Sequence, residues 1–119
     1  MFKSIGVAFD GIIDLIKCEN NAKIHAISTI VVILVGLKLQ FLAIEWLWIS
    51  LAIAGVWVAE LINTSLERLT DLVSPEMNPI AKKVKDYAAG AVLVMAIWAI
   101  FVFCLISFPH LWMWLAFSR

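Results

Sequence analysis

The stretch Glu60-Leu-Ile-Asn63-Thr-Ser-Leu-Glu67-Arg-Leu-Thr-Asp71 directly follows an uncharged apolar run from Trp46 to Ala59. In a helix that turns by about 100° per residue, Glu67 and Asp71 fall within roughly 20° of Glu60. Asn63 then lies about 60° to one side. The helix carries one acidic, amide-bearing stripe whose first residues lie at membrane depth. Carboxylates there are costly unless paired, hydrated or bound to a cation, so the stripe is a candidate functional site.

A helix that simply leaves the membrane at Glu60 would be the structural alternative. Such a helix would carry mixed charges on all of its faces beyond that point. Instead, apolar residues continue around the rest of the surface, namely Leu61, Ile62, Leu66, Leu69 and Leu72. The pattern favours a site over a solvated acidic face.

The composition places the chain in a bilayer. It has 119 residues, of which 64% are hydrophobic and 15% are charged. A soluble domain has an apolar content nearer half, so this chain has too little polar surface to cover a globule. A net charge of +0 argues against nucleic acid as a partner. We expect one membrane domain over residues 1–119.

Residues 2–17 have the pattern of an amphipathic helix. The charged residues cluster on one side and the apolar residues on the other. This pattern predicts a helix that lies in the membrane interface. The apolar side consists of Phe2, Ile5, Phe9, Ile12, Ile13 and Ile16.

Three spans follow in an all-α membrane fold. The apolar runs predict them at residues 24–44, 45–72 and 86–108. The second span is longer than the hydrocarbon requires, so its last turns should project into the interface. Prolines break the chain within Ser74–Pro79, and Pro109 marks an end or a kink of the third span.

The basic residues predict the orientation. Seven of the nine lie on the side of the N-terminus and of the second loop, and Lys38 and Arg119 lie on the other. An excess of lysine and arginine marks the cytoplasmic side, so the N-terminus and the acidic stripe should be cytoplasmic. The seven are Lys3, Lys17, Lys23, Arg68, Lys82, Lys83 and Lys85.

The polar residues on that side are carboxylates, amides and lysines. Mg²⁺ takes oxygen ligands and needs only one or two carboxylates plus substrate phosphates. A lysine can neutralise phosphates, and a further carboxylate can accept a proton from an attacking hydroxyl. A proton or cation pathway uses similar residues, so a non-enzymatic membrane oligomer or proton conductor is the alternative of a different class.

The motifs resemble the small prokaryotic diacylglycerol kinase family, which also contains undecaprenol kinases. The resemblance runs from Gly6 through the third span and rests on several segments. They are Phe9-Asp-Gly11-Ile, Glu19-Asn-Asn-Ala-Lys-Ile-His25, Glu60-Leu-Ile-Asn63-Thr-Ser-Leu-Glu67 with Asp71, Val84-Lys85-Asp86 and Ala88-Ala-Gly-Ala-Val92.

The resemblance implies an integral enzyme of the bacterial plasma membrane. Each chain would supply a surface helix and three spans to a homotrimer. The enzyme would transfer the γ-phosphate of ATP, with Mg²⁺, to the primary alcohol of a membrane lipid. Diacylglycerol, giving phosphatidic acid, is the expected acceptor, and undecaprenol, giving undecaprenyl phosphate, is the alternative.

The resemblance also implies roles for the stripe and for the corner before the first span. Glu60 would be the general base that takes the proton from the lipid hydroxyl. Glu19 and Glu67 would hold the magnesium of the nucleotide. Asn63 would orient the reacting groups, and Asp71 would support the lower stripe.

Further contacts to the nucleotide and the lipid are implied in the same way. Lys85 would bind phosphates, with Asp86 beside it on the nucleotide. The loop residues Glu76, Met77 and Asn78 would meet the nucleoside, although Met77 replaces an aromatic residue found in many relatives. The lipid would contact Ala8, Phe9, Asn21 and Lys23, besides Glu60.

The remaining polar residues have more ordinary interpretations. His25 is expected to cap or line the start of the first span rather than act as a base. His110 should be interfacial on the outer side. Arg68 fits a phosphate contact and a membrane-surface role equally well. Lys82 and Lys83 are expected to contact anionic lipid headgroups.

Overall fold

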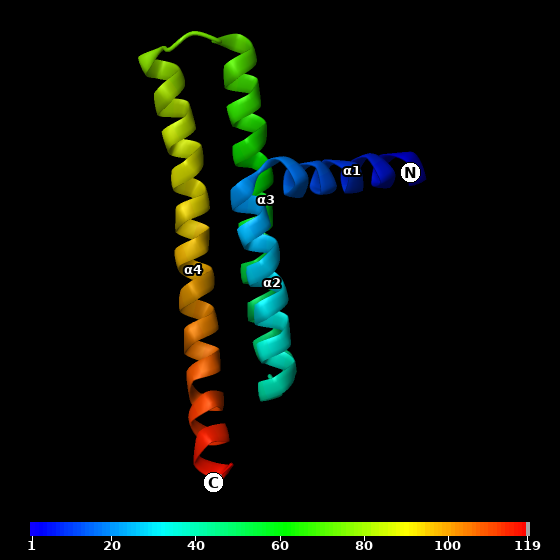
Figure 1. The fold of residues 1–119 in the computed structure, drawn as a ribbon, viewed down its shortest axis with the longest axis vertical. Coiled ribbons are helices and arrows are strands. Elements are labelled where there is room, and N and C mark those ends of the chain that lie inside the picture. The colour runs from blue at the N-terminus through cyan, green and yellow to red at the C-terminus, as the bar shows by residue number, and fades with distance from the viewer. Residues whose placement is uncertain (119) are drawn as a thin grey trace.

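The computed structural model describes residues 1–118 as helices joined by short connections (Figure 1). Arg119, which the charge count used, lies outside the described residues. Three helices are long and apolar enough to cross a membrane, which confirms the all-α fold with three spans. The elements in chain order are α1 (Phe2–Cys18), α2 (Asn20–Leu39), α3 (Ala43–Val73) and α4 (Pro79–Phe117).

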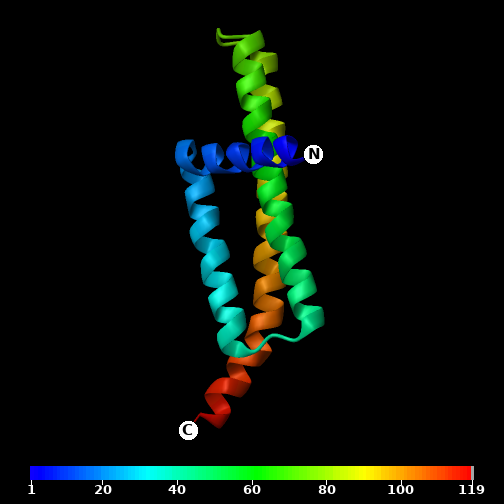
Figure 2. The ribbon, with the colours of Figure 1, turned by 90° about the vertical axis from the view of Figure 1, so that its right-hand side faces the viewer.

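The helices α3 and α4 form a long antiparallel hairpin, and α2 lies beside α3 (Figure 1). Figure 2 shows α1 running across the axis of the other helices. In both views the hairpin extends past the level of α1 at the end that carries its connecting loop. We call this the loop end of the bundle. The stripe on α3 therefore runs toward the loop end.

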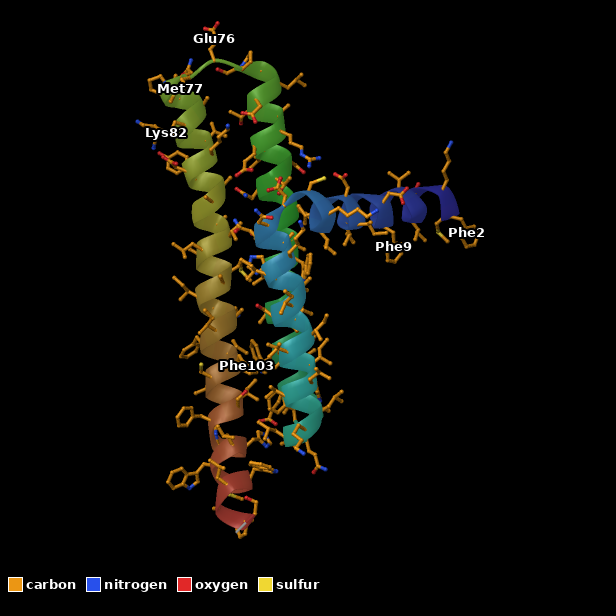
Figure 3. All side chains as sticks on the ribbon, in the orientation of Figure 1. Phe2, Phe9, Glu76, Met77, Lys82 and Phe103 are labelled. Carbon is orange, nitrogen blue, oxygen red and sulfur yellow. The ribbon has the colours of Figure 1, made fainter. Side chains whose placement is uncertain are left out.

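The helix α1 matches the predicted surface helix over residues 2–17. Its side chains Phe2 and Phe9 are 86% and 61% exposed, and both point to the side from which α2 runs (Figure 3). If α2 enters the bilayer, these aromatic side chains enter it as well. Leu15 is buried where α1 meets the other helices.

A single residue, Glu19, separates α1 from α2. Its backbone is extended, with φ −107° and ψ 122°. Its N–H donates to the carbonyl of Leu15 at 2.9 Å, and its own carbonyl accepts from the N–H of Lys23 at 3.3 Å. The corner therefore keeps the hydrogen bonds of both helices while turning the chain out of the interface.

The predicted first span, 24–44, was wrong at its end. The helix α2 ends at Leu39, because Gln40 takes the left-handed conformation with φ 57° and ψ 58°. The N–H of Phe41 then donates to the carbonyl of Gly36 at 3.0 Å, which closes the helix end. The turn is itself largely apolar, so the hydropathy of the sequence gives no signal for the end of the helix.

The second span begins at Ala43, close to the predicted residue 45, and ends at Val73. Its first turn is capped because the carboxylate of Glu45 accepts from the N–H of Leu42 at 2.8 Å. Near the start of α3 lies a small core of buried side chains. Its members are Phe41, Ile49, Ala52 and Val102, with Trp46 and others packed against them.

The third span is part of a longer helix than the predicted 86–108. Asn78 caps the start, since its Oδ1 accepts from the N–H of Ile80 at 2.8 Å, and Pro79 occupies the first turn. The helix continues through Pro109 to Phe117. Figure 2 shows its last turns leaning away from the rest of α4, as a proline inside a helix predicts.

Candidate active site

Burial of the stripe decreases along α3 from membrane depth toward the loop end. Glu60 is 2% exposed and Asn63 is 9% exposed. Glu67 is half-buried and Asp71 is exposed. The side chain nearest the apolar run is therefore the best shielded from solvent, and the stripe ends in water.

The buried carboxylate of Glu60 has a partner that the sequence analysis missed. His25 Nε2, on α2, lies 3.0 Å from Glu60 Oε1. The side chain of His25 is 20% exposed and that of Glu60 is 3% exposed. His25 was expected to cap or line the start of its span rather than act as a base, and the contact with Glu60 adds to that expectation. Helical periodicity holds no signal for a pairing between residues on different helices.

Two hydrogen bonds hold the turn of α2 that carries His25 against α3. Thr29 Oγ1 donates to the carbonyl of His25 at 2.7 Å. Trp57 Nε1 on α3 donates in turn to Thr29 Oγ1 at 3.0 Å. Trp57 therefore ties α3 to α2 close to Glu60.

The amide of Asn63 connects the two halves of the stripe. Its Nδ2 donates to Oε1 of Glu67 at 3.3 Å. Its Oδ1 is buried and has no hydrogen-bond partner in the described part of the chain. A buried acceptor without a donor is costly, so this oxygen is available to a ligand.

The stripe ends in an ion pair between α3 and α4, next to a second ion pair within α4. Lys85 Nζ lies 2.5 Å from Oδ1 of Asp71. Lys82 Nζ lies 2.7 Å from Oδ2 of Asp86, one turn along α4. The structure thus joins Asp71 to the predicted phosphate-binding lysine, and it gives Asp86 a partner other than Lys85.

A third ion pair joins α1 to α3. Arg68 donates from Nη1 to Oδ2 of Asp14 at 3.1 Å. The hydrogen bond from Arg68 is the main reason that the pKa of Asp14 lies below its usual value, followed by one from the Cys18 thiol. Both partners of the ion pair are more than half exposed. In this chain, then, Arg68 anchors the surface helix.

The predicted nucleoside contacts lie at the tip of the loop end. Glu76 and Met77 extend away from the helices (Figure 3), and Met77 is fully exposed. Asn78 uses its side-chain oxygen to cap α4. The predicted lipid contacts lie elsewhere and are exposed: Ala8 and Phe9 on α1, and Asn21 and Lys23 in the first turn of α2.

Within residues 1–118, no three acidic, histidine or cysteine side chains gather closely enough to hold a metal ion. Glu67 is half-buried beside Asn63, and Glu19 is half-buried at the corner between α1 and α2. Mg²⁺ bound to a nucleotide needs only one or two carboxylates from the protein. The oxygen donors of Glu67 and the free Oδ1 of Asn63 suit such an ion.

An apolar cleft of about 310 Å³ lies between α2, α3 and α4. His25 and Thr29 line it from α2, and Val56 lines it from α3. From α4 the lining consists of Ala96, Ala99, Ile100 and Phe103. Figure 3 shows Phe103 on the side of α4 that faces α2. The cleft therefore runs within the apolar part of the bundle and reaches the histidine that contacts Glu60.

Known proteins with similar sequences identify the family of the chain. The family model for prokaryotic diacylglycerol kinase matches residues 6–107. An undecaprenol kinase from Bacillus subtilis is 38% identical over 110 residues, which cover 92% of this chain and 89% of that protein.

Two diacylglycerol kinases are also similar to the chain. The one from Synechocystis sp. is 36% identical over 100 residues, 83% of this chain and 57% of that protein. The one from Escherichia coli (strain K12) is 20% identical over 110 residues, 92% of this chain and 90% of that protein. With a family match over most of its length and a buried carboxylate among polar groups at its centre, the chain belongs to the prokaryotic diacylglycerol kinase family and is a lipid kinase.

Proposed function

We propose that this lipid kinase transfers the γ-phosphate of magnesium-bound ATP to the primary alcohol of a membrane lipid, with Glu60 as general base. The burial of Glu60 on an apolar helix, beside His25 in the second turn of α2, carries the proposal. A lipid alcohol stays in the bilayer, so its base must lie there as well.

The reaction is a direct displacement. Glu60 accepts the proton of the lipid hydroxyl while the hydroxyl oxygen forms a bond to the γ-phosphorus. The bond between that phosphorus and the oxygen bridging to the β-phosphate breaks, and ADP leaves. The protonated Glu60 then releases its proton to solvent.

The next residues along the stripe are placed to hold the reacting phosphate. Glu67 lies seven positions beyond Glu60, or roughly 10 Å along the helix axis, which spans a hydroxyl and a γ-phosphate. Asn63 lies between them, and its free Oδ1 accepts a hydrogen bond from the lipid hydroxyl and so orients it toward the phosphate. Glu67, together with Glu19, would hold the magnesium, which neutralises charge on the phosphates when it is bound.

Lys85 provides the cation for the phosphates at the loop end, with Asp71 holding its ammonium group in place. Asp86 then contacts the nucleotide from the same turn of α4. The nucleoside reaches the loop tip at Glu76, Met77 and Asn78.

Undecaprenol is the acceptor that we favour, with diacylglycerol as the second candidate. The undecaprenol kinase from Bacillus subtilis shares 38% identity across 92% of this chain. The diacylglycerol kinase from Synechocystis, at 36% identity over 83% of this chain, favours the second candidate. Both lipids present one primary alcohol on apolar chains. The lipid meets the enzyme at Ala8, Phe9, Asn21 and Lys23.

The site faces the cytoplasm, where ATP is available, and the N-terminus lies on the same side. The excess of basic residues on that side supports this orientation. It also puts the apolar face of α1 against the inner leaflet.

We further propose that the active assembly is a homotrimer with sites shared between chains. Glu19 lies at a corner rather than in a cluster with Glu67, so it can serve a neighbouring chain. Mixing the inactive variants Glu19→Gln and Glu60→Gln tests this proposal. Shared sites predict partial recovery of activity in mixed assemblies, whereas sites confined to one chain predict none.

The decisive experiment measures phosphorylation by Glu60→Gln with ATP and magnesium, in parallel on undecaprenol, diacylglycerol and other lipid alcohols. We expect turnover to disappear while binding of a non-hydrolysable ATP analogue is retained. Glu45→Gln is the matched control, because Glu45 is the first acidic residue of the same helix and pairs with His110 at the opposite end. Near-normal turnover by Glu60→Gln would refute the assignment of the base.

The same assay tests the alternative of a different class. A proton conductor or a structural oligomer would consume no ATP with any lipid alcohol. Such a result for the wild-type protein would overturn the proposed reaction altogether.

A further inference from the structure

The contact between His25 and Glu60 isolates one oxygen of the carboxylate. His25 Nε2 lies 3.0 Å from Oε1, and no partner of Oε2 is found in the described part of the chain. An ionised carboxylate only accepts hydrogen bonds, so Nε2 must carry the proton. The geometry therefore makes His25 a donor to Oε1 and leaves Oε2 unoccupied.

The other acidic groups near the stripe have partners of their own. Glu67 accepts from Asn63 on α3, Asp71 pairs with Lys85 on α4, and Asp14 on α1 pairs with Arg68. At the level of His25, α4 contributes only apolar side chains to the cleft that His25 lines. Within residues 1–118, no lysine or arginine forms an ion pair with Glu60. His25 is thus the group that compensates its charge.

His25 is also held where this role requires it. The hydrogen bonds from Trp57 to Thr29 and from Thr29 to the carbonyl of His25 fix its turn of α2. The imidazole lies between the apolar cleft and the carboxylate, since it lines the cleft and contacts Glu60. A lipid chain in the cleft would therefore bring its alcohol to the edge of this pair.

We propose that His25 is a positioning residue for the general base. Its Nε2–H donates to Oε1 of Glu60, fixes the rotation of the carboxylate and leaves Oε2 free for the lipid hydroxyl. The inference rests on the proposed role of Glu60 as base, and it adds a residue from α2 to the site.

A second histidine–glutamate pair in the same chain provides the control. His110 Nε2 on α4 lies 2.7 Å from Glu45 Oε1 on α3, and both side chains are partly exposed. This pair has the same chemistry and joins two helices at the opposite end of the bundle. A purely structural role for such pairs predicts similar consequences when either histidine is replaced.

The test compares His25→Leu, His25→Gln and His110→Leu in the full-length protein. For His25→Leu we expect kcat at neutral pH to fall about tenfold or more, with KM for ATP unchanged. His25→Gln, whose amide is a donor, should recover part of kcat. His110→Leu should keep the wild-type kcat.

Several outcomes would overturn the inference. One is a wild-type kcat in His25→Leu. Another is a loss that is not recovered by His25→Gln and is equalled by His110→Leu, since these features describe structural damage. If Glu60→Gln stays active, the proposed base fails; if it is inactive while His25→Leu is normal, only the role of His25 fails.

A spectroscopic measurement on the wild-type protein covers the case in which the variants do not fold. Nitrogen-15 NMR of the histidine rings reports which ring nitrogen is protonated. We expect His25 to carry its proton on Nε2 and to lose this preference in Glu60→Leu, which removes the acceptor. A mixture of tautomers that does not respond to Glu60→Leu would refute the hydrogen bond.

Discussion

Asp71 on α3 and Lys85 on α4 form an ion pair at the water-facing end of the stripe, with 2.5 Å between Oδ1 and Nζ. The lysine predicted to bind phosphates thus already has an anionic partner across the hairpin. In the proposed mechanism the carboxylate holds the ammonium group in place. ATP then approaches a lysine whose side chain is ordered.

This pair predicts that replacing the lysine raises KM for ATP more than replacing the aspartate does. Lys85→Met removes the charge itself, and KM for ATP should rise about tenfold. Asp71→Asn removes only the partner, and because the pair is largely exposed, KM should change by about threefold or less. Steady-state kinetics with saturating lipid measure both. Lys83→Met, a neighbouring exposed lysine, should leave KM unchanged; an equal rise there would indicate a general surface-charge effect.

The unpaired Oδ1 of Asn63 predicts that a substitution removing this oxygen lowers kcat. Asn63→Ala removes both the free Oδ1 and the donor to Glu67, and kcat should fall about tenfold or more. Asn63→Asp should fare no better, because it places a second carboxylate against Glu67. Ser65→Ala on the exposed side of the same helix is the control, and its kcat should match the wild type. A kcat close to wild type in Asn63→Ala would mean that the oxygen meets no reacting group.

The pKa of Asp14 reports on the docking of α1. The hydrogen bond from Arg68 lowers this pKa, so the pair stabilises the docked helix above the usual pKa of an aspartate. That contribution is lost as the pH falls through the lowered value. Arg68→Gln should raise the pKa of Asp14 toward its usual value in a carbon-13 NMR titration. Lys17→Gln, which removes a weaker and more distant charge, should shift it less; equal shifts would contradict the assignment.

Two glycines in the spans predict different costs of an added methyl group. At Gly36 a Cβ would meet rings on two residues, Trp46 and Phe41, the latter at 2.9 Å. Gly36→Ala should lower the free energy of unfolding by about 1–3 kcal/mol. At Gly55 the neighbour is the end of the flexible Met95 side chain, so Gly55→Ala should cost about 1 kcal/mol or less. Unfolding in mixed micelles measures both, and equal costs would refute the distinction.

The fold could be read from the sequence to the extent that it depends on hydropathy and helical period. The three spans and the surface helix follow from these patterns. The end of α2 could not be predicted from the sequence, because Phe41 and Leu42 directly follow Gln40 and continue the apolar run. The early start of α4 has a signal in Asn78 followed by Pro79, because this pair is typical of a helix start as well as of a chain break.

The candidate site was predictable along a single helix and not between helices. The spacing of Glu60, Asn63 and Glu67 placed them on one stripe, and Asn63 does contact Glu67. The partners that α2 and α1 bring, His25 for Glu60 and Asp14 for Arg68, depend on how whole helices dock. Nothing in the periodicity of either segment encodes that rotation.

The one-residue corner at Glu19 couples the orientation of the surface helix α1 to the orientation of α2, which carries His25. Each residue advances a helix by about 100°, so inserting or deleting one residue there would rotate α2 against α1 by that angle. Phe9 would then turn out of the lipid, or His25 would swing away from Glu60. The length of this one-residue connection therefore sets the rotation of α2, and with it the position of His25 beside the proposed base, relative to α1.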